Sequence, residues 1–137
     1  MTPPVRADVV VGVGIDAVDV ARYRRVLERT PGIAARTFTG SELAYARLVT
    51  DPTQRLAVRF AAKEAAMKSL GVGLGACRLQ DLEVVRADGG APSLVLHGAA
   101  VDRAAERGVT RFLVSLTHTD LTAQAIVLAL APPPPAF

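Results

Sequence analysis

The chain has 137 residues, of which half are apolar and 21% are charged, and this length and composition fit one globular domain with a substantial core. No apolar run is long enough to predict a membrane span, and the single cysteine, Cys77, excludes an internal disulfide and favours a cytoplasmic protein. The formal net charge of +3 predicts an acidic partner. The few aromatic residues do not alternate with basic ones, which argues against nucleic acid as that partner.

Apolar periodicity and turn residues predict the order of strands and helices along the chain. The predicted elements are a buried strand (8–15), a helix (19–30), a turn into a short helix (38–43), a long helix (50–71), a flexible glycine loop (71–75), a strand hairpin (81–87 and 93–98), a helix (99–108) and a second hairpin (111–119 and 122–130). We expect the first strand to end at Asp16 and Asp19 to cap the first helix. We expect Gly71 to end the long helix.

This order predicts an α+β domain over residues 8–131, with helices packed on a mostly antiparallel sheet. Residues 1–7 are expected to form a flexible N-terminal extension, and the proline-rich residues 132–137 a disordered tail. A small domain with so many apolar residues is also expected to leave one sheet face for another copy to cover.

The two lysines of the chain lie in the segment RFAAKEAAMKSLG (59–71), whereas every other cationic residue is an arginine. Lys63 aligns with the apolar seam of the predicted helix, and Glu64 and Lys68 are four residues apart beside that seam. One interpretation is ordinary: Glu64 and Lys68 form a solvated pair, and Lys63 extends its ammonium to water. The other is a phosphate site with a metal ligand, because lysine is a compact charge that contacts phosphate oxygens and can protonate a leaving group.

A magnesium site usually takes one or two protein carboxylates together with phosphates and waters, so Glu64 needs a partner. Asp16 is the leading candidate, because it follows a strand whose glycines allow the backbone to run close to a ligand. The alternative is that Asp16 is only a cap or a turn residue.

Three arginines on the first predicted helix, Arg22, Arg25 and Arg29, fall on one stripe. Arg24 is expected to pair with Glu28, four residues further on, which leaves the stripe without acidic partners. The stripe is either a solvated face or a docking surface for an acidic protein.

Six segments of the chain resemble the short, single-repeat 4′-phosphopantetheinyl transferases, the holo-[acyl-carrier-protein] synthases. In chain order they are VGIDAVDVAR (13–22), FTGSEL (38–43), RFAAKEAAMKSLG (59–71), DLEV (81–84), GGAP (89–92) and SLTHT (115–119). The resemblance implies an enzyme that transfers 4′-phosphopantetheine from coenzyme A to a serine hydroxyl of an apo acyl carrier protein and releases adenosine 3′,5′-bisphosphate. It also implies Mg²⁺ dependence and a homotrimer with active sites at the subunit interfaces.

The resemblance further implies roles for individual residues. Asp16 and Glu64 are expected to hold the metal, and coenzyme A is expected to contact Lys63, Lys68, Gly71, Thr117 and His118. Lys68 would steady or protonate the leaving group. Glu64, directly or through a water beside the metal, would accept the serine proton. Arg22, and with it the arginine stripe, would dock the acyl carrier protein.

Two alternatives stay open. The first is a non-catalytic basic module that binds nucleic acid or an acidic protein through the arginine stripe. The second is another Mg²⁺-dependent phosphoryl or nucleotidyl transferase, which would use Asp16 and Glu64 but not coenzyme A. Ala91 stands where the resembled family often has a basic residue, so the sequence leaves open which carrier protein is served.

Overall fold

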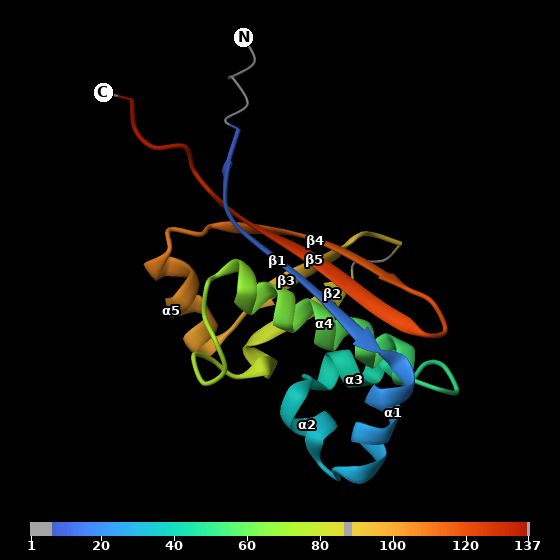
Figure 1. The fold of residues 1–137 in the computed structure, drawn as a ribbon. Coiled ribbons are helices and arrows are strands. Elements are labelled where there is room, and N and C mark those ends of the chain that lie inside the picture. Colours follow the sequence, from blue (N-terminus) through green and yellow to red (C-terminus); the bar gives the residue numbers. More distant parts are fainter. Residues whose placement is uncertain (1–6, 87–88, 137) are drawn as a thin grey trace.

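The computed structural model describes residues 7–86 and 89–136. Its elements, in chain order, are strand β1 (Val9–Asp19), helices α1 (Val20–Arg29), α2 (Ile33–Thr37), α3 (Gly40–Ala46) and α4 (Thr53–Ser69), the 3-10 turn η1 (Leu79–Asp81), strands β2 (Leu82–Arg86) and β3 (Pro92–Leu96), helix α5 (Gly98–Glu106), and strands β4 (Arg111–His118) and β5 (Thr122–Ala131). Helices α1 to α3 gather at one end of the molecule, and α4 runs from there along the sheet towards α5 (Figure 1). The predicted α+β class is confirmed, although the prediction lacked α2 and η1. Residues 1–6 of the predicted extension lie outside the described residues, as do residues 87–88 of the first hairpin turn.

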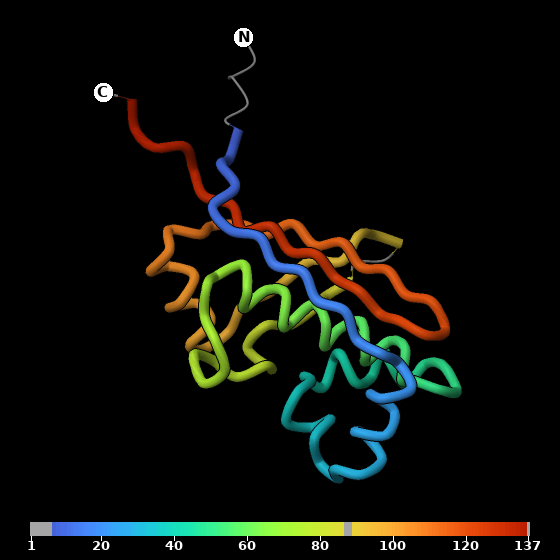
Figure 2. The backbone as a smooth tube through the Cα atoms, in the orientation of Figure 1, coloured from blue at the N-terminus to red at the C-terminus, as the bar shows by residue number. Residues whose placement is uncertain are grey.

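The strands pair antiparallel in two sheets. In the larger sheet β5 lies between β1 and β4, and the smaller sheet consists of β2 and β3. Both predicted hairpins are therefore present, but they belong to two sheets where one was expected. Figure 2 shows the first described strand running beside the last one, and these two strands, β1 and β5, pair in the sheet that carries Asp16.

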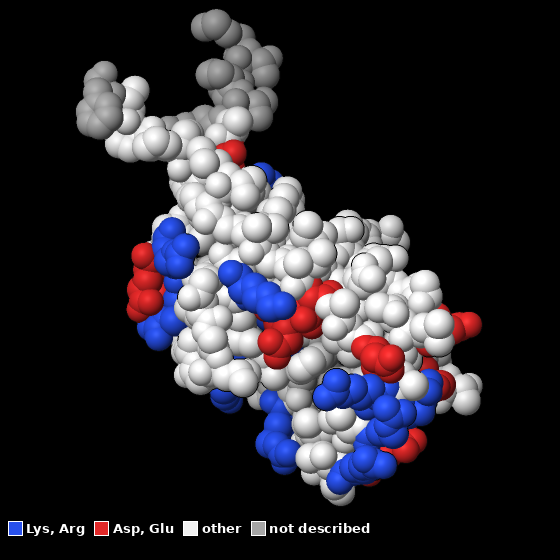
Figure 3. All heavy atoms as spheres, in the orientation of Figure 1, with Lys and Arg blue, Asp and Glu red and all other residues white. Residues whose placement is uncertain are grey.

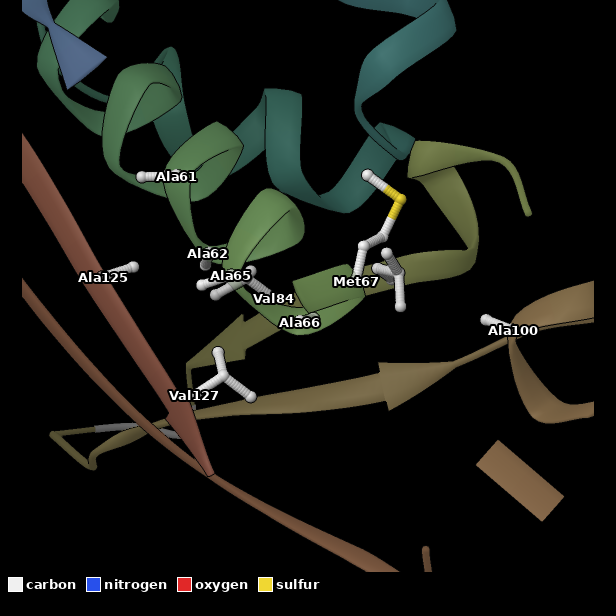
Figure 4. Close-up of a cluster of buried hydrophobic side chains, with 10 residues drawn as sticks. Ala61, Ala62, Ala65, Ala66, Met67, Val84, Ala100, Ala125 and Val127 are labelled. Carbon is white, nitrogen blue, oxygen red and sulfur yellow. The ribbon is translucent and has the colours of Figure 1, made fainter. Parts of the chain in front are cut away.

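Helix α4 packs so closely on β1 that only glycine fits at two positions of the strand. A Cβ atom added to Gly12 would lie 1.9 Å from the carbonyl oxygen of Ser69, and one added to Gly14 would lie 1.8 Å from that of Ala65. The surrounding core is built mostly from small side chains of α4 and β5 (Figure 4), among them Ala61, Ala62, Ala65, Ala66, Ala125 and Val127. The prediction that these glycines make room for a ligand is wrong, because the backbone of α4 occupies that space.

Strand β1 is longer and more exposed than the sequence predicts. It continues past Asp16 to Asp19, whose carboxylate caps α1 by accepting a hydrogen bond of 2.8 Å from the Arg22 amide. Asp16 therefore lies within the strand, opposite Ala125 of β5. The register of β1 shifts between Val10 and Gly12, and the side chains that it places on the outer face, Val10, Val13 and Ile15, are 54–63% exposed. The prediction of a fully buried strand is wrong for this face.

Helix α4 has 17 residues and ends at the predicted glycine. Gly71 adopts a left-handed backbone conformation with φ 67°. Its amide donates to the Lys68 carbonyl, and the Val72 amide donates to the Met67 carbonyl, a pair of hydrogen bonds that closes the helix C-terminus. No helix within the described part of the chain is long and apolar enough to cross a membrane.

Candidate active site

Asp16 and Glu64 face the same hollow, which we call the carboxylate hollow and which has a volume of about 480 Å³. Asp16 is carried by β1 and Glu64 by α4, so the packing of this helix on this strand brings the two carboxylates together. Apolar side chains from α1, α2 and α4, including Val26, Ile33 and Phe60, line much of the remaining wall. The predicted juxtaposition of Asp16 and Glu64 is therefore present.

The electrostatics of the carboxylate hollow suit a divalent cation. The pKa of the Glu64 carboxyl is raised, because partial burial desolvates it and the charge of Asp16 repels it, with an opposing effect from Lys68. A bound cation would relieve this repulsion. Among residues 7–86 and 89–136 no group of three or more His, Cys, Asp or Glu side chains could hold a metal ion. Two carboxylates fit Mg²⁺, which commonly takes its other oxygen ligands from substrate phosphates and water.

Lys68 lies beside Asp16, with 55% of its side chain exposed. Its ammonium donates to the carbonyl of Ile15 at 2.9 Å and to Asp16 Oδ1 at 3.3 Å. Lys68 thus pairs with Asp16, and not with Glu64 as the helical spacing allowed. Its exposed ammonium is in reach of a phosphate bound next to Asp16.

Lys63 is fully buried. Its ammonium donates to Glu42 Oε1 at 2.7 Å and to the carbonyl oxygens of Leu79 and Leu82, both at 2.9 Å. All three ammonium donors are therefore used inside the protein. The prediction that Lys63 contacts coenzyme A is wrong, and so is the alternative that its ammonium extends to water.

Glu42, the buried partner of Lys63, was not among the predicted site residues. Besides Lys63, its carboxylate accepts hydrogen bonds from the amides of Thr39 and Val84 at 2.9 and 3.0 Å. Thr39 and Glu42 form a capping box at the start of α3, in which the side chain of each accepts a hydrogen bond from the amide of the other. This local S/T-x-x-E pattern could have indicated the hydrogen bond from the Thr39 amide to Glu42. The pairing with Lys63 has no local signal, because 21 residues separate the two.

A second hollow, of about 350 Å³, lies beside strand β4, and we call it the arginine hollow. It is lined by Tyr45, Arg55, Val58, Arg59, Arg86, Pro92, Leu116, Thr117 and His118. Thr117 and His118 were predicted to contact coenzyme A, whereas no sequence motif indicated the three arginines. Arg55 and Arg59 are one helical turn apart on α4, a spacing that indicates a shared face, whereas Arg86 comes from β2.

Arg59 is the buried member of the arginine hollow. Its exposed fraction is only 3%, and burial lowers the pKa of its guanidinium. Its Nε atom has no hydrogen-bond partner among the described residues. A buried guanidinium with an unused donor favours an anion as its missing partner, and phosphate is well matched to its geometry.

The two hollows lie on different sides of α4. They have no lining residue in common. Arg59 and Glu64 are five positions apart, and at 3.6 residues per turn their side chains point about 140° apart around the helix axis. One chain therefore presents its carboxylates and its buried arginine in different directions.

The arginine stripe of α1 is present as predicted. Arg22, Arg25 and Arg29 line a shallow hollow of about 320 Å³, and Arg22 also borders the carboxylate hollow. Within the described residues none of the three forms an ion pair with a carboxylate. Arg24 is paired, but with Asp51 at 2.9 Å and not with the residue four positions on. Figure 3 shows basic side chains gathered over the end of the molecule that α1 and α2 form.

Gly71 has a structural role in this chain. A Cβ atom at this position would lie 2.6 Å from Nη1 of Arg107, which donates to the Leu70 carbonyl at 3.0 Å. Glycine is needed here for the left-handed backbone at the helix end, whereas the end of the Arg107 side chain could shift to make room for a Cβ atom. A contact between Gly71 and coenzyme A stays a prediction.

Comparison with known proteins agrees with the resemblance noted in the sequence. Residues 12–129 match the profile of the 4′-phosphopantetheinyl transferase superfamily. The chain is 46% identical over 115 residues to the holo-[acyl-carrier-protein] synthase of Moorella thermoacetica, in an alignment that covers 84% of this chain and 90% of that protein. It is similar in structure to a holo-ACP-synthase from Plasmodium yoelii, with a TM-score of 0.82, 26% identity, and coverage of 93% and 100% of the two chains. It is also similar to a Bacillus anthracis holo-(acyl-carrier-protein) synthase in complex with CoA (3′,5′-ADP), with a TM-score of 0.74, 29% identity, and coverage of 91% and 99%.

The chain therefore belongs to the 4′-phosphopantetheinyl transferase superfamily. The relatives and solved structures just described are holo-[acyl-carrier-protein] synthases, so the resemblance seen in its sequence motifs is confirmed. The prediction of an enzyme of this type is confirmed as well, against the alternative of a non-catalytic binding module.

Proposed function

We propose that this enzyme transfers 4′-phosphopantetheine from coenzyme A to a serine hydroxyl of an apo acyl carrier protein, with Mg²⁺, and releases adenosine 3′,5′-bisphosphate. The observation that carries the proposal is that Asp16 and Glu64 share one hollow, with Lys68 bound to Asp16 and Arg22 at the border. Displacement at a pyrophosphate requires neutralised phosphate oxygens and an acceptor for the proton of the nucleophile. The partner protein supplies the nucleophile, so the enzyme needs none of its own.

Two residues of the chain act in the reaction: Glu64 on the serine proton and Lys68 on the leaving group. Glu64 accepts the serine proton, directly or through a water beside it. The serine oxygen forms a bond to the β-phosphorus of coenzyme A while the bond from that phosphorus to the bridging oxygen breaks. Lys68 stabilises or protonates this oxygen, which leaves on the 5′-phosphate of the adenosine bisphosphate.

Asp16 and Glu64 are the residues that would hold Mg²⁺. When bound, the ion neutralises charge on the pyrophosphate oxygens. Asp16 also holds the ammonium of Lys68 beside the hollow, at 3.3 Å in the structure. Chelation of divalent ions should therefore abolish transfer, and added Mg²⁺ should restore it.

Coenzyme A carries a further phosphate on the 3′-oxygen of its ribose, and we infer that the arginine hollow receives it. Three arginines and His118 surround this hollow, and Arg59 has an unused buried donor. A single nucleotide would have to wrap around α4 to reach both hollows of one chain. We therefore propose that one copy supplies the carboxylate hollow and a neighbouring copy the arginine hollow.

The outer face of the larger sheet is a surface on which such copies can meet. Its exposed apolar side chains come from all three strands, for example Val13 and Ile15 of β1, Leu113 of β4 and Ile126 of β5. Because the hollows point in different directions, we propose a head-to-tail contact, which forms a closed ring when the rotation between copies closes. A homotrimer is the ring that we propose.

The carrier protein is proposed to dock on α1. Acyl carrier proteins present acidic side chains, and the stripe of Arg22, Arg25 and Arg29 has no carboxylate partner within the described residues. Guanidinium forks bind carboxylates with two hydrogen bonds, so the stripe can both attract and orient the partner. Because Arg22 also borders the carboxylate hollow, docking there brings the partner's serine to Glu64.

We propose residues 8–131 as the catalytic unit. Val9 of β1 pairs with Ala131 at the end of β5, and this is the outermost residue pair between the two strands. Residues 132–137 lie beyond this pair and are expected to be dispensable for transfer.

The proposed function is tested by mass spectrometry of an apo acyl carrier protein incubated with the enzyme, coenzyme A and Mg²⁺. We expect the carrier to gain the mass of one phosphopantetheine group. Glu64→Gln should lower kcat by about 10²- to 10⁴-fold, whereas Glu106→Gln, at an exposed carboxylate on α5, should not change it. Near-normal turnover by Glu64→Gln would exclude Glu64 from both of its roles. An unmodified carrier with the wild-type enzyme would instead favour another phosphoryl or nucleotidyl transferase.

A further inference from the structure

The arginine hollow concentrates positive charge without an acidic counterpart. Arg55, Arg59 and Arg86 all face it, and no described carboxylate lines it. Guanidinium groups that share one hollow repel each other, and in a partly buried setting this repulsion is poorly screened. Some feature other than an ion pair must therefore hold the three side chains together.

Tyr45 of α3 is the residue that all three arginines approach. The guanidinium carbons of Arg55 and Arg59 each lie 4.3 Å from the centre of its ring, and Arg55 Nη1 also donates to its main-chain carbonyl at 2.9 Å. Burial by itself raises the pKa of the Tyr45 hydroxyl, but this pKa is lowered overall by a side-chain hydrogen bond with Arg86 and by the charges of the three arginines. Tyr45 thus contacts two cationic groups of α4 with its ring, and Arg86 of β2 lines the same hollow.

An aromatic ring and a carboxylate have different effects on the net charge of the arginines that they hold. A carboxylate would hold the arginines but would cancel their charge. The face of a phenol ring attracts a guanidinium through its quadrupole and leaves the net charge unchanged. The arginines around Tyr45 therefore remain available for an anion, and their positions are set before that anion arrives.

We propose that Tyr45 is a positioning residue that preorganises Arg55 and Arg59 for a phosphate monoester and so makes the enzyme select nucleotides that carry a 3′-phosphate. The inference rests on the proposed function, because coenzyme A is the substrate that brings this phosphate. Tyr45 itself need not touch the nucleotide. Its effect on binding is exerted through the two arginines.

The test is equilibrium binding of two nucleotides, adenosine 3′,5′-bisphosphate and adenosine 5′-monophosphate, measured by isothermal titration calorimetry. We expect the wild-type enzyme to bind the bisphosphate about tenfold more tightly or better, because only this nucleotide reaches both cationic sites. In Tyr45→Leu the ratio of the two affinities should fall at least about fivefold, since the two cation–π contacts are lost. Tyr45→Phe keeps the ring and should keep the ratio within about twofold. A partly unfolded variant would lose both affinities equally, so the ratio reports positioning and not folding.

A double variant separates an effect through the arginines from a direct contact. In an Arg59→Met background, Tyr45→Leu should lower the ratio by much less than it does in the wild-type background. An unchanged ratio in Tyr45→Leu, equal loss of both affinities, or full additivity with Arg59→Met would overturn the role of Tyr45. A wild-type enzyme that discriminates between the nucleotides but fails to modify an apo carrier protein would refute the proposed function and not this role.

Discussion

Lys63 and Lys68, five positions apart on α4, occupy opposite kinds of environment. Lys63 meets three acceptors within 2.9 Å, which match the three donors of an ammonium group. A guanidinium is larger and planar and would not satisfy the same three oxygens. Lys68 is largely exposed and lies beside Asp16, where a mobile point charge can contact a phosphate. A chain that otherwise uses arginine therefore has two separate reasons for its two lysines.

Replacement of Lys63 by Met should lower the free energy of unfolding by about 3–5 kcal/mol, because the buried carboxylate of Glu42 is left without its partner. The measurement is urea denaturation. The double variant Lys63→Met/Glu42→Gln should recover much of the loss, since no unpaired charge stays buried. Lys68→Met is the matched control and should cost less than about 1 kcal/mol. Similar losses for the two lysine variants would contradict the structural role assigned to Lys63.

Arg22 tests the proposed docking of the carrier protein. Arg22→Glu should raise KM for the apo carrier protein about tenfold or more, because a repulsive charge replaces an attractive one at the border of the carboxylate hollow. KM for coenzyme A should change much less, by less than about twofold, since Lys68 and the arginine hollow are proposed to hold its phosphates and Arg22 lies only at the border of the site. Steady-state kinetics with each substrate varied in turn gives both values. Arg47→Glu, an exposed arginine at the end of α3, is the control, and equal effects on both substrates in Arg22→Glu would exclude a docking role.

At the scale of the elements, the contact between β1 and α4 holds the active site together. Asp16 and Glu64 face one hollow only because the strand and the helix backbones touch at Gly12 and Gly14. Any side chain at these positions would push α4 away and separate the carboxylates. The glycines thus act on the proposed metal site through packing and not through direct contact with a ligand.

Gly14→Ala should therefore destabilise the fold strongly, by about 3 kcal/mol or more, because its Cβ would overlap the Ala65 carbonyl and the surrounding core is tightly packed. Thermal or urea unfolding checks the value. Gly40→Ala is the matched control, since a Cβ there meets no atom within 4 Å and α3 gains helix propensity. A Gly14→Ala variant as stable as Gly40→Ala would show that α4 can move without cost.

At the scale of the whole molecule, the outer face of the larger sheet is the feature that one chain leaves incomplete. In β1 alone, Val13 and Ile15 are 58% and 63% exposed. Contiguous apolar surface of this kind on a small domain marks an interface. The two hollows of one chain lie on different sides of α4. Assembly through this face would therefore matter for catalysis, because a neighbouring copy would complete the site.

Ile15→Glu should convert the proposed trimer into monomers and abolish transfer, because a charge cannot be buried in that interface without a partner. Analytical ultracentrifugation measures the mass in solution, and circular dichroism shows whether the fold persists. Leu48→Glu, at an apolar residue that is 76% exposed outside the sheet, is the control and should stay assembled and active. A wild-type monomer that is fully active would refute the shared site.

Much of the fold follows from local patterns in the sequence. The hairpins formed by β2–β3 and β4–β5, the cap at Asp19 and the end of α4 at Gly71 were predicted because each depends on residues a few positions apart. Helix α2 was missed because five residues are too few to show a periodic pattern. Of the candidate site, the sequence anticipated that Asp16 and Glu64 share a hollow and that α1 carries an arginine stripe, but Asp16 lies within β1 and not at its end, and Lys68 pairs with Asp16 and not with Glu64.

The sequence by itself determined the order of the strands and of all helices but α2 and η1, the pair of acidic residues and the family motifs, because these depend on residue types at short, regular spacing. Only the tertiary structure decided that Lys63 is buried against Glu42, that Arg86 joins Arg55 and Arg59 at one hollow, and that Gly12 and Gly14 face α4. These contacts join segments tens of residues apart. Which of these contacts form depends on how the helices and sheets pack, and the short-range spacing of residues does not predict that packing.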